Sequence, residues 1–221
     1  LTYLKRKGFV VIAKLFRNKV FIQDKLLFFD KTGDKMKEIT IENNNSHNIM
    51  RSYVPATNND SILAFFGTYD LSTGKPFRFE DYKDNENPST GGFFYLQLAN
   101  QKQTKLKFYG FLDFSNISGT FLYRAYQMSK SKAKGGKKSI PVASLLYVGK
   151  PQLIKANNQY IITVEAYKPS YRTETRMDYD FYGRAFPYTY QVFDGYDFYD
   201  LILAGFSETG QYVWDNDFPL E

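Results

Sequence analysis

The chain has 221 residues, contains no cysteine and carries a net charge of +6, with 43% hydrophobic and 19% aromatic residues. The absence of cysteine excludes disulfides, thiol nucleophiles, thiolate zinc sites and a lipidated cysteine within this segment, and no apolar run approaches the ~18 residues that a membrane helix needs. Tyr and Phe favour pleated, half-buried surfaces, so the composition predicts an all-β protein.

The charge is distributed unevenly along the chain. Residues 1–164 carry 25 Lys and Arg against 12 Asp and Glu, or +13, whereas residues 165–221 carry 4 against 11, or −7. A basic half can attract phosphate, anionic lipid or an acidic protein. Alternatively, the two halves can neutralise each other within the fold, and the sequence leaves both readings open.

Short strands separated by turn residues dominate the chain. Thr32-Gly33 is expected to close a tight hairpin in which Gly33 takes a positive φ, and the Asn-rich residues 43–48 are expected to form a loop. Residues 69–74 and 100–103 are expected to be the turns of two further hairpins. Strand patterns cover residues 8–15, 19–23, 25–30, 36–41, 61–67, 76–79, 91–98, 104–110, 143–148, 160–167, 201–206 and 211–215.

Thr-Gly turns recur along the sequence. Phe206-Ser-Glu-Thr-Gly repeats the pattern Phe29-Asp-Lys-Thr-Gly, and Gly33 and Gly74 are 41 residues apart. This distance falls within the ~40–50-residue period of four-stranded propeller blades. We therefore predict one all-β, propeller-like domain over residues 1–221. At ~45 residues per blade the chain holds too few blades for a common closed propeller, so we expect it to continue beyond Glu221.

Residues 113–140 interrupt this regularity and are expected to be an irregular insertion. Residues 120–130 could form a short helix, and the Lys- and Gly-rich stretch that follows predicts a mobile loop, because it cannot bury enough apolar surface to order itself. The alternative is a site for nucleic acid or anionic lipid. The absence of an aromatic residue within the cluster argues against nucleic acid. The basic residues of this loop are Lys130, Lys132, Lys134, Lys137 and Lys138.

Few residues in the chain could carry catalytic or metal chemistry. His47 is the only histidine, which excludes a catalytic triad and a zinc site built on several histidines. Paired carboxylates could serve a glycosidase or bind Ca²⁺, although Asp beside Gly and Tyr is also ordinary turn chemistry. The candidate carboxylates are Asp178, Asp180, Asp194, Asp197 and Asp200. We expect no cofactor.

The densest aromatic run lies between residues 179 and 199. Alternating rings of this kind predict a sheet core for most of them, with Tyr hydroxyls at its rim. Flat rings beside Asp and Arg also suit a protein-binding or sugar-binding surface, because they combine apolar area with hydrogen-bonding tips. The binding candidates are Tyr171, Arg172, Tyr182 and Tyr196.

The order of motifs over residues 160–218 is distinctive. Glu165-Ala-Tyr-Lys-Pro is followed by Tyr179-Asp-Phe-Tyr-Gly-Arg, Gln191-Val-Phe-Asp-Gly-Tyr and Ala204-Gly-Phe, and then by Trp214-Asp-Asn. This order resembles a group of uncharacterised, propeller-like envelope or secreted proteins of Bacteroidota. The resemblance implies an exported β protein that is located in the periplasm, at the outer membrane or on the cell surface. It implies no catalytic residues.

The sequence therefore predicts a non-catalytic, extracytoplasmic binding or scaffold module within an envelope-associated assembly. A protein partner is expected, a glycan stays open, and nucleic acid is disfavoured. The alternative is a carbohydrate-binding or carbohydrate-active protein that uses the aromatic and acidic stretch 167–200.

Overall fold

The computed structural model describes residues 2–4, 8–44, 48–58, 62–71, 90–117 and 147–220. Within these residues the chain forms three antiparallel sheets, and the all-β prediction is confirmed. The strands are β1 (Thr2–Leu4), β2 (Gly8–Arg17), β3 (Val20–Phe29), β4 (Lys35–Thr40), β5 (Asn48–Asn58), β6 (Ile62–Leu71), β7 (Thr90–Ala99), β8 (Lys102–Gly110), β9 (Tyr147–Val148), β10 (Gln152–Ala156), β11 (Gln159–Tyr179), β12 (Ala185–Ser207) and β13 (Tyr212–Pro219).

Each sheet is a meander in which neighbours along the chain are also neighbours in space. Sheet A has the order β1-β2-β3-β4, and sheet B the order β5-β6-β7-β8. Sheet C has the order β10-β11-β12-β13, with β9 paired to the edge of β11. The strand β5 contacts both β1 and β10, so the first strands of the three meanders lie together. No helix among the described residues is long and apolar enough to cross a membrane.

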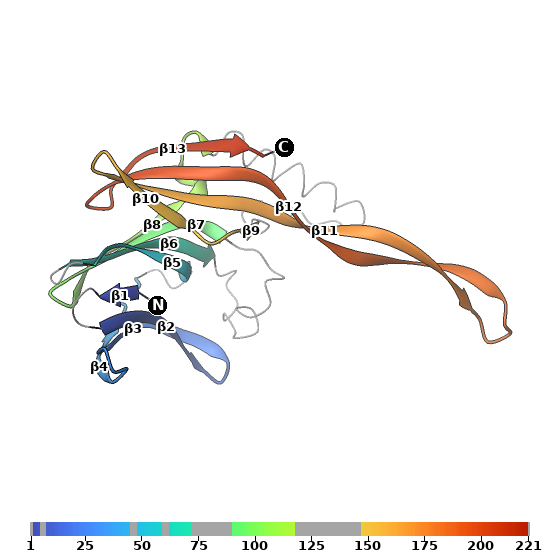
Figure 1. Ribbon diagram of the computed structural model, residues 1–221, viewed down its shortest axis with the longest axis horizontal. Coiled ribbons are helices and arrows are strands. Elements are labelled where there is room, and N and C mark those ends of the chain that lie inside the picture. Colours follow the sequence, from blue (N-terminus) through green and yellow to red (C-terminus); the bar gives the residue numbers. More distant parts are fainter. Residues whose placement is uncertain are drawn as a thin grey trace.

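The three sheets stack face to face, with sheet B between the other two (Figure 1). A strand that is covered on both faces must be apolar on both, so it reads as a continuous hydrophobic run. The strand β6 shows this pattern, because every residue from Leu63 to Asp70 is buried. Phe65 packs towards sheet A, and its neighbour Phe66 packs towards sheet C.

An aromatic cluster joins sheets B and C. The ring of Phe66 lies 4.9 Å from that of Tyr95, 5.6 Å from that of Tyr160 and 5.0 Å from that of Phe206. Phe66, Tyr95 and Phe206 are all fully buried. Burial also raises the pKa of the Tyr95 hydroxyl to about 12. These rings therefore join sheets B and C through apolar contacts.

The predicted repetition of the Thr-Gly turn is confirmed. The amide of Asp30 donates to the carbonyl of Asp34 at 3.0 Å, and the amide of Ser207 donates to the carbonyl of Gln211 at 2.8 Å, so the two turns close in the same way. A β-bulge precedes both turns at the equivalent position. A third turn of this form, residues 180–184, connects β11 to β12.

Alanine at Gly33 and at Gly210 provides a matched pair of substitutions. Both glycines have positive φ, 95° and 72°, where alanine costs about 1–2 kcal/mol. An added Cβ meets nothing within 4 Å at Gly33, whereas at Gly210 it comes within 2.2 Å of the Tyr95 ring. We expect Gly210→Ala to lower the free energy of unfolding, measured by urea denaturation, by about 1–3 kcal/mol more than Gly33→Ala. Equal losses would show that the second turn does not pack on Tyr95.

A buried carboxylate fixes the end of sheet B to sheet C. Asp215 in β13 accepts backbone amides from Asn116 and Ile117, each at 2.7 Å, and from Ser115 at 3.2 Å. It also accepts the hydroxyl of Tyr212. Burial raises the pKa of Asp215, but these hydrogen bonds favour the ionised form and outweigh it, so the pKa is lowered. The chain therefore leaves the described part of sheet B at a fixed point.

Several predicted boundaries were wrong. The two strands predicted at 19–23 and 25–30 form one strand, β3 (Val20–Phe29), and the turn before it is the pair Asn18-Lys19, both with positive φ. The turn predicted at 69–74 is strand as far as Leu71. The strands β1, β5 and β10 were not predicted, and β11 and β12 extend well beyond the predicted segments 160–167 and 201–206.

Other predictions lie outside the described residues. These are His47, the turn at Gly74, the strand 76–79, the helix 120–130 and the five lysines of the basic loop, Lys130, Lys132, Lys134, Lys137 and Lys138.

Candidate functional site

The second half of β11 and the first half of β12 form a long two-stranded hairpin that extends away from the stacked sheets (Figure 1). Beyond Tyr167 these strands pair only with each other within the described residues. We call residues 168–198 the arm. Bulges at Ala166/Tyr167 and Ser170/Tyr171 mark its start, and bulges bend strands and increase their twist. The strand that packs sheet C on sheet B therefore also carries the arm.

A continuous row of aromatic rings, which we call the aromatic ladder, starts at Tyr167 and runs along one face of the arm. Consecutive rings contact each other with centroids 5.1–5.9 Å apart. Most contacts are edge to face, with interplanar angles of 70–74°. The members of the aromatic ladder are Tyr167, Phe198, Tyr196, Phe193 and Tyr171.

The aromatic ladder is exposed, and the prediction that most of these rings face a sheet core was wrong. Tyr171, Phe193 and Tyr196 are each 50–53% exposed. The reason is that none of the described residues forms a second sheet behind the arm, so alternation gives two solvated faces. A signal for this was present in the sequence. Charged residues alternate with Thr173 and Thr175 in this half of β11, and neither set can face a core.

The opposite face of the arm is a charged network laid over tyrosines. The guanidinium of Arg176 lies over the rings of Tyr188 and Tyr190, at 5.4 and 5.8 Å. The Tyr190 hydroxyl donates to Glu174 at 3.0 Å, and this hydrogen bond to the carboxylate raises the pKa of Tyr190. Arg172 binds both Glu174, at 2.8 Å, and Asp194, at 3.4 Å. The predicted binding residue Arg172 therefore lies on the face opposite Tyr171.

The tip of the arm presents two exposed rings. Phe181 is 98% and Tyr182 79% exposed, and their centroids are 5.6 Å apart. Asp180 orders the turn, since its carboxylate accepts the amides of Tyr182 and Arg184 at 2.9 Å and pairs with the Arg184 guanidinium. The hydrogen bonds from Arg184 are the main reason that the pKa of Asp180 is lowered. Tyr182 was among the predicted binding residues, whereas Phe181 was not.

The candidate carboxylates do not converge on one site. Asp178 lies about seven residues further along the arm than Asp194, or roughly 25 Å at about 3.3 Å per residue. Asp200 is fully buried in sheet C, opposite Ala166, roughly 40 Å from Asp178 on the same scale. Glycosidase carboxylates lie about 5–9.5 Å apart. Asp178 therefore cannot form such a pair with Asp194 or Asp200.

Two of the candidate carboxylates also form ion pairs with basic side chains. Asp178 lies 3.6 Å from Arg176, and Asp197 lies 3.7 Å from Lys168. The described part of the chain contains no group of three or more acidic or histidine side chains placed to hold a metal ion.

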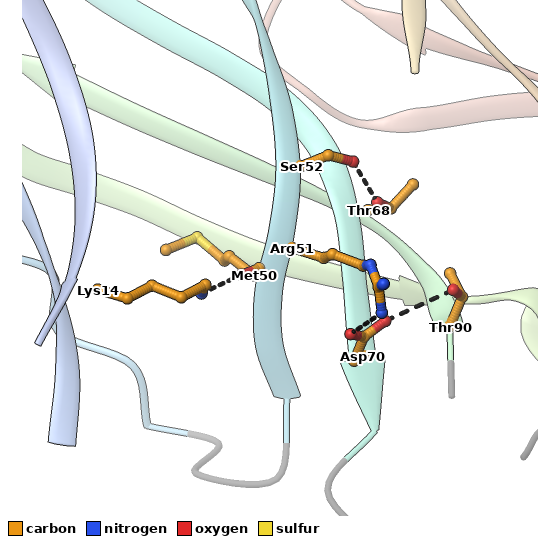
Figure 2. A network of polar contacts seen from close by, with 7 residues as sticks. All are labelled: Lys14, Met50, Arg51, Ser52, Thr68, Asp70 and Thr90. Atoms are coloured by element: carbon orange, nitrogen blue, oxygen red, sulfur yellow. Dashed lines mark hydrogen bonds and ion pairs between the residues drawn. The ribbon is translucent and has the colours of Figure 1, made fainter. Parts of the chain in front are cut away.

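The polar residues near the foot of the arm form a buried network between the sheets (Figure 2). Arg51 in β5 pairs with Asp70 in β6 at 2.7 Å, and Thr90 in β7 donates to the same carboxylate at 3.5 Å. Burial raises the pKa of Asp70, and Arg51 opposes this shift. Burial also raises the pKa of Tyr167, the first ring of the aromatic ladder, and the charge of Arg51 opposes that shift as well. The base of the arm, at Tyr167, therefore lies close to the positive charge of Arg51.

A cleft of about 460 Å³ lies on the body, away from the arm. The side-chain amide of Gln103 pairs with the backbone of Glu42 through hydrogen bonds of 2.8 and 2.9 Å, which tie the end of sheet A to β8. None of the residues predicted to bind lines this cleft. Its lining is Glu42, Asn43, Asn44, Gln103, Thr104, Lys105, Leu106 and Phe108.

Comparison of the chain with protein-family models, with curated proteins and with solved structures gives no match. The arm is the feature of the described residues that departs most from a packed body.

Proposed function

We propose that the protein is a non-catalytic binding module that holds a protein partner on the arm. The observation that carries this proposal is the aromatic ladder, which is half exposed along a hairpin that no sheet of the described residues covers. A two-stranded hairpin is marginally stable alone in water. Aromatic residues are enriched in the cores of protein interfaces, and Tyr is enriched among the few hot-spot residues that carry most of the binding energy.

The packing of the rings favours a protein partner over a glycan. Sugars stack on flat, open ring faces, but the edge-to-face contacts of the aromatic ladder turn successive rings out of one plane. On the other face, Arg176 covers the rings of Tyr188 and Tyr190. A protein surface can fill the uneven relief between such rings with its own side chains.

We propose further that the three sheets are consecutive blades of a propeller-like array. Three features support this: the four-strand meander order, the face-to-face stacking, and the contacts of β5 with β1 and β10. The location outside the cytoplasm and the place in an envelope-associated assembly rest on the resemblance over residues 160–218. Cell fractionation tests that location.

The arm proposal predicts which substitutions abolish binding. The double variant Tyr171→Ser/Phe193→Ser is expected to weaken the complex with the co-purifying partner about 30-fold or more, as expected for loss of aromatic hot spots worth ~2 kcal/mol or more. Native purification with mass spectrometry identifies the partner, and titration of the purified proteins by calorimetry measures the affinity. Both side chains are about half exposed, so the fold should be unaffected.

A matched control lies on the other face of the same hairpin. Tyr188→Ser removes a ring that is 46% exposed but lies outside the aromatic ladder, and we expect it to change the affinity less than threefold. A variant in which an Asn-Gly turn replaces residues 171–193 should bind no partner. If this shortened protein retains every partner, the proposal is wrong. Binding of the wild type to glycans but not to protein would favour the carbohydrate alternative.

A further inference from the structure

The outer sheets of the stack each have one apolar face that no described residue covers. In sheet A, Val10, Leu26 and Phe28 face sheet B, so alternation puts their neighbours on the outer side. Phe9 and Phe29 stack there with centroids 5.0 Å apart, and Leu15 is 41% exposed. We call this surface outer face A, and its apolar members are Phe9, Val11, Leu15, Leu27 and Phe29.

Sheet C has an outer face of the same kind. Tyr160, Ile162 and Val164 face sheet B, so the alternate residues of β11 face outwards. The Trp214 ring lies against Gly205 on this side and donates to Gln159 at 3.0 Å. We call it outer face C, and its apolar members are Ile154, Ile161, Leu201, Leu203, Trp214 and Phe218.

The stack itself shows how such faces pair. Sheet A packs one face on sheet B, and sheet B packs its opposite face on sheet C. Among the described residues, no sheet packs on outer face A or on outer face C. The adjacent first strands show that the three meanders are stacked in one orientation. Joining outer face C to outer face A would therefore repeat a contact that the molecule already makes twice.

We propose that outer face A of one copy packs on outer face C of a second copy, so that two copies continue the same stack. The contact is head to tail, with different surfaces on the two partners, and it leads to a ring if the rotation closes. It leaves the arm free, and it does not depend on the function proposed for the arm.

Sedimentation equilibrium of the full-length chain tests this assembly with one variant for each face. Leu15→Asp lies on outer face A and Phe218→Asp on outer face C, and both side chains are over 40% exposed, which protects the fold. We expect the wild type to self-associate and each variant alone to do so at least tenfold more weakly. Phe181→Ser, at the tip of the arm, should leave self-association unchanged.

Mixing the two variants is the decisive step. A head-to-tail contact can use outer face A of the Phe218→Asp variant and outer face C of the Leu15→Asp variant, which are both intact. An equimolar mixture should therefore form a heterodimer, whereas neither variant alone should dimerise. A mixture that stays monomeric, while the wild type associates, would overturn the proposal. A wild type that is monomeric at about 100 μM would also overturn it, because a complex with a Kd of about 10 μM would be mostly formed at that concentration. The same holds if the wild type associates and only Phe181→Ser weakens that association.

Discussion

Phe66→Ala is expected to lower the free energy of unfolding by about 3–5 kcal/mol. The side chain is fully buried and its ring contacts those of Tyr95, Tyr160 and Phe206, which come from both sides of the interface between sheets B and C. Truncation removes these contacts and leaves a cavity that rigid strands on both sides cannot close. Urea denaturation followed by Trp214 fluorescence measures the loss, since this residue belongs to sheet C.

The control for this substitution is Phe181→Ala at the tip of the arm. Its ring is 98% exposed, so its removal is expected to change the free energy of unfolding by less than about 0.5 kcal/mol. A loss below about 1 kcal/mol for Phe66→Ala would contradict the packing of sheet B on sheet C.

Asp24→Ala is expected to destabilise the fold by a similar amount, about 3–5 kcal/mol, through electrostatics and not through a cavity. Asp24 is 3% exposed, and it accepts a hydrogen bond from Lys14 at 2.9 Å. The same ammonium donates to the carbonyl of Met50 in β5, which joins sheet A to sheet B (Figure 2). Removal of the carboxylate leaves a poorly hydrated cation in the interface.

A double replacement separates the cost of a lone charge from the value of the pair. Burial raises the pKa of Asp24, and Lys14 opposes the shift without cancelling it. The ionised carboxylate is thus the more costly form in the folded protein, and its contribution to stability falls as the pH rises through its folded-state pKa. Lys14→Met/Asp24→Leu should therefore unfold within about 1 kcal/mol of the wild type at pH 7, or be more stable. If the double variant is as unstable as Asp24→Ala, the pair is itself stabilising.

The local features of the fold were predictable because a few residues determine them. Asp30 caps its own turn with its side chain, and Gly33 supplies the positive φ, so the pattern Phe-Asp-Lys-Thr-Gly predicts the hairpin without any knowledge of the rest. The same logic predicted the turn at Gly210. Alternation and β-branched residues predicted the core half of β11, residues 160–167.

The arm was not predictable in the same way, because exposure depends on what lies behind a strand. The ring pattern of Tyr171, Phe193 and Tyr196 is the same whether or not a sheet covers it. The same holds for the buried ion pairs. Lys14 and Asp24 read as surface residues on a half-exposed strand until sheet B is placed against them. Both errors concern contacts between segments that are distant in the sequence.

The two-sided burial of sheet B has a consequence for folding during synthesis. Sheets A and B can close on each other as soon as residue 110 has left the ribosome, but the apolar row that includes Phe66 and Tyr95 then lacks the side chains of sheet C that cover it in the folded protein. Those side chains, among them Tyr160, Ile202 and Phe206, follow 50 to 96 residues later. At about 5–20 residues per second, the nascent chain exposes this apolar row for several seconds. During that interval we expect it to be the preferred binding site for a chaperone, and the main origin of aggregation when expression is fast.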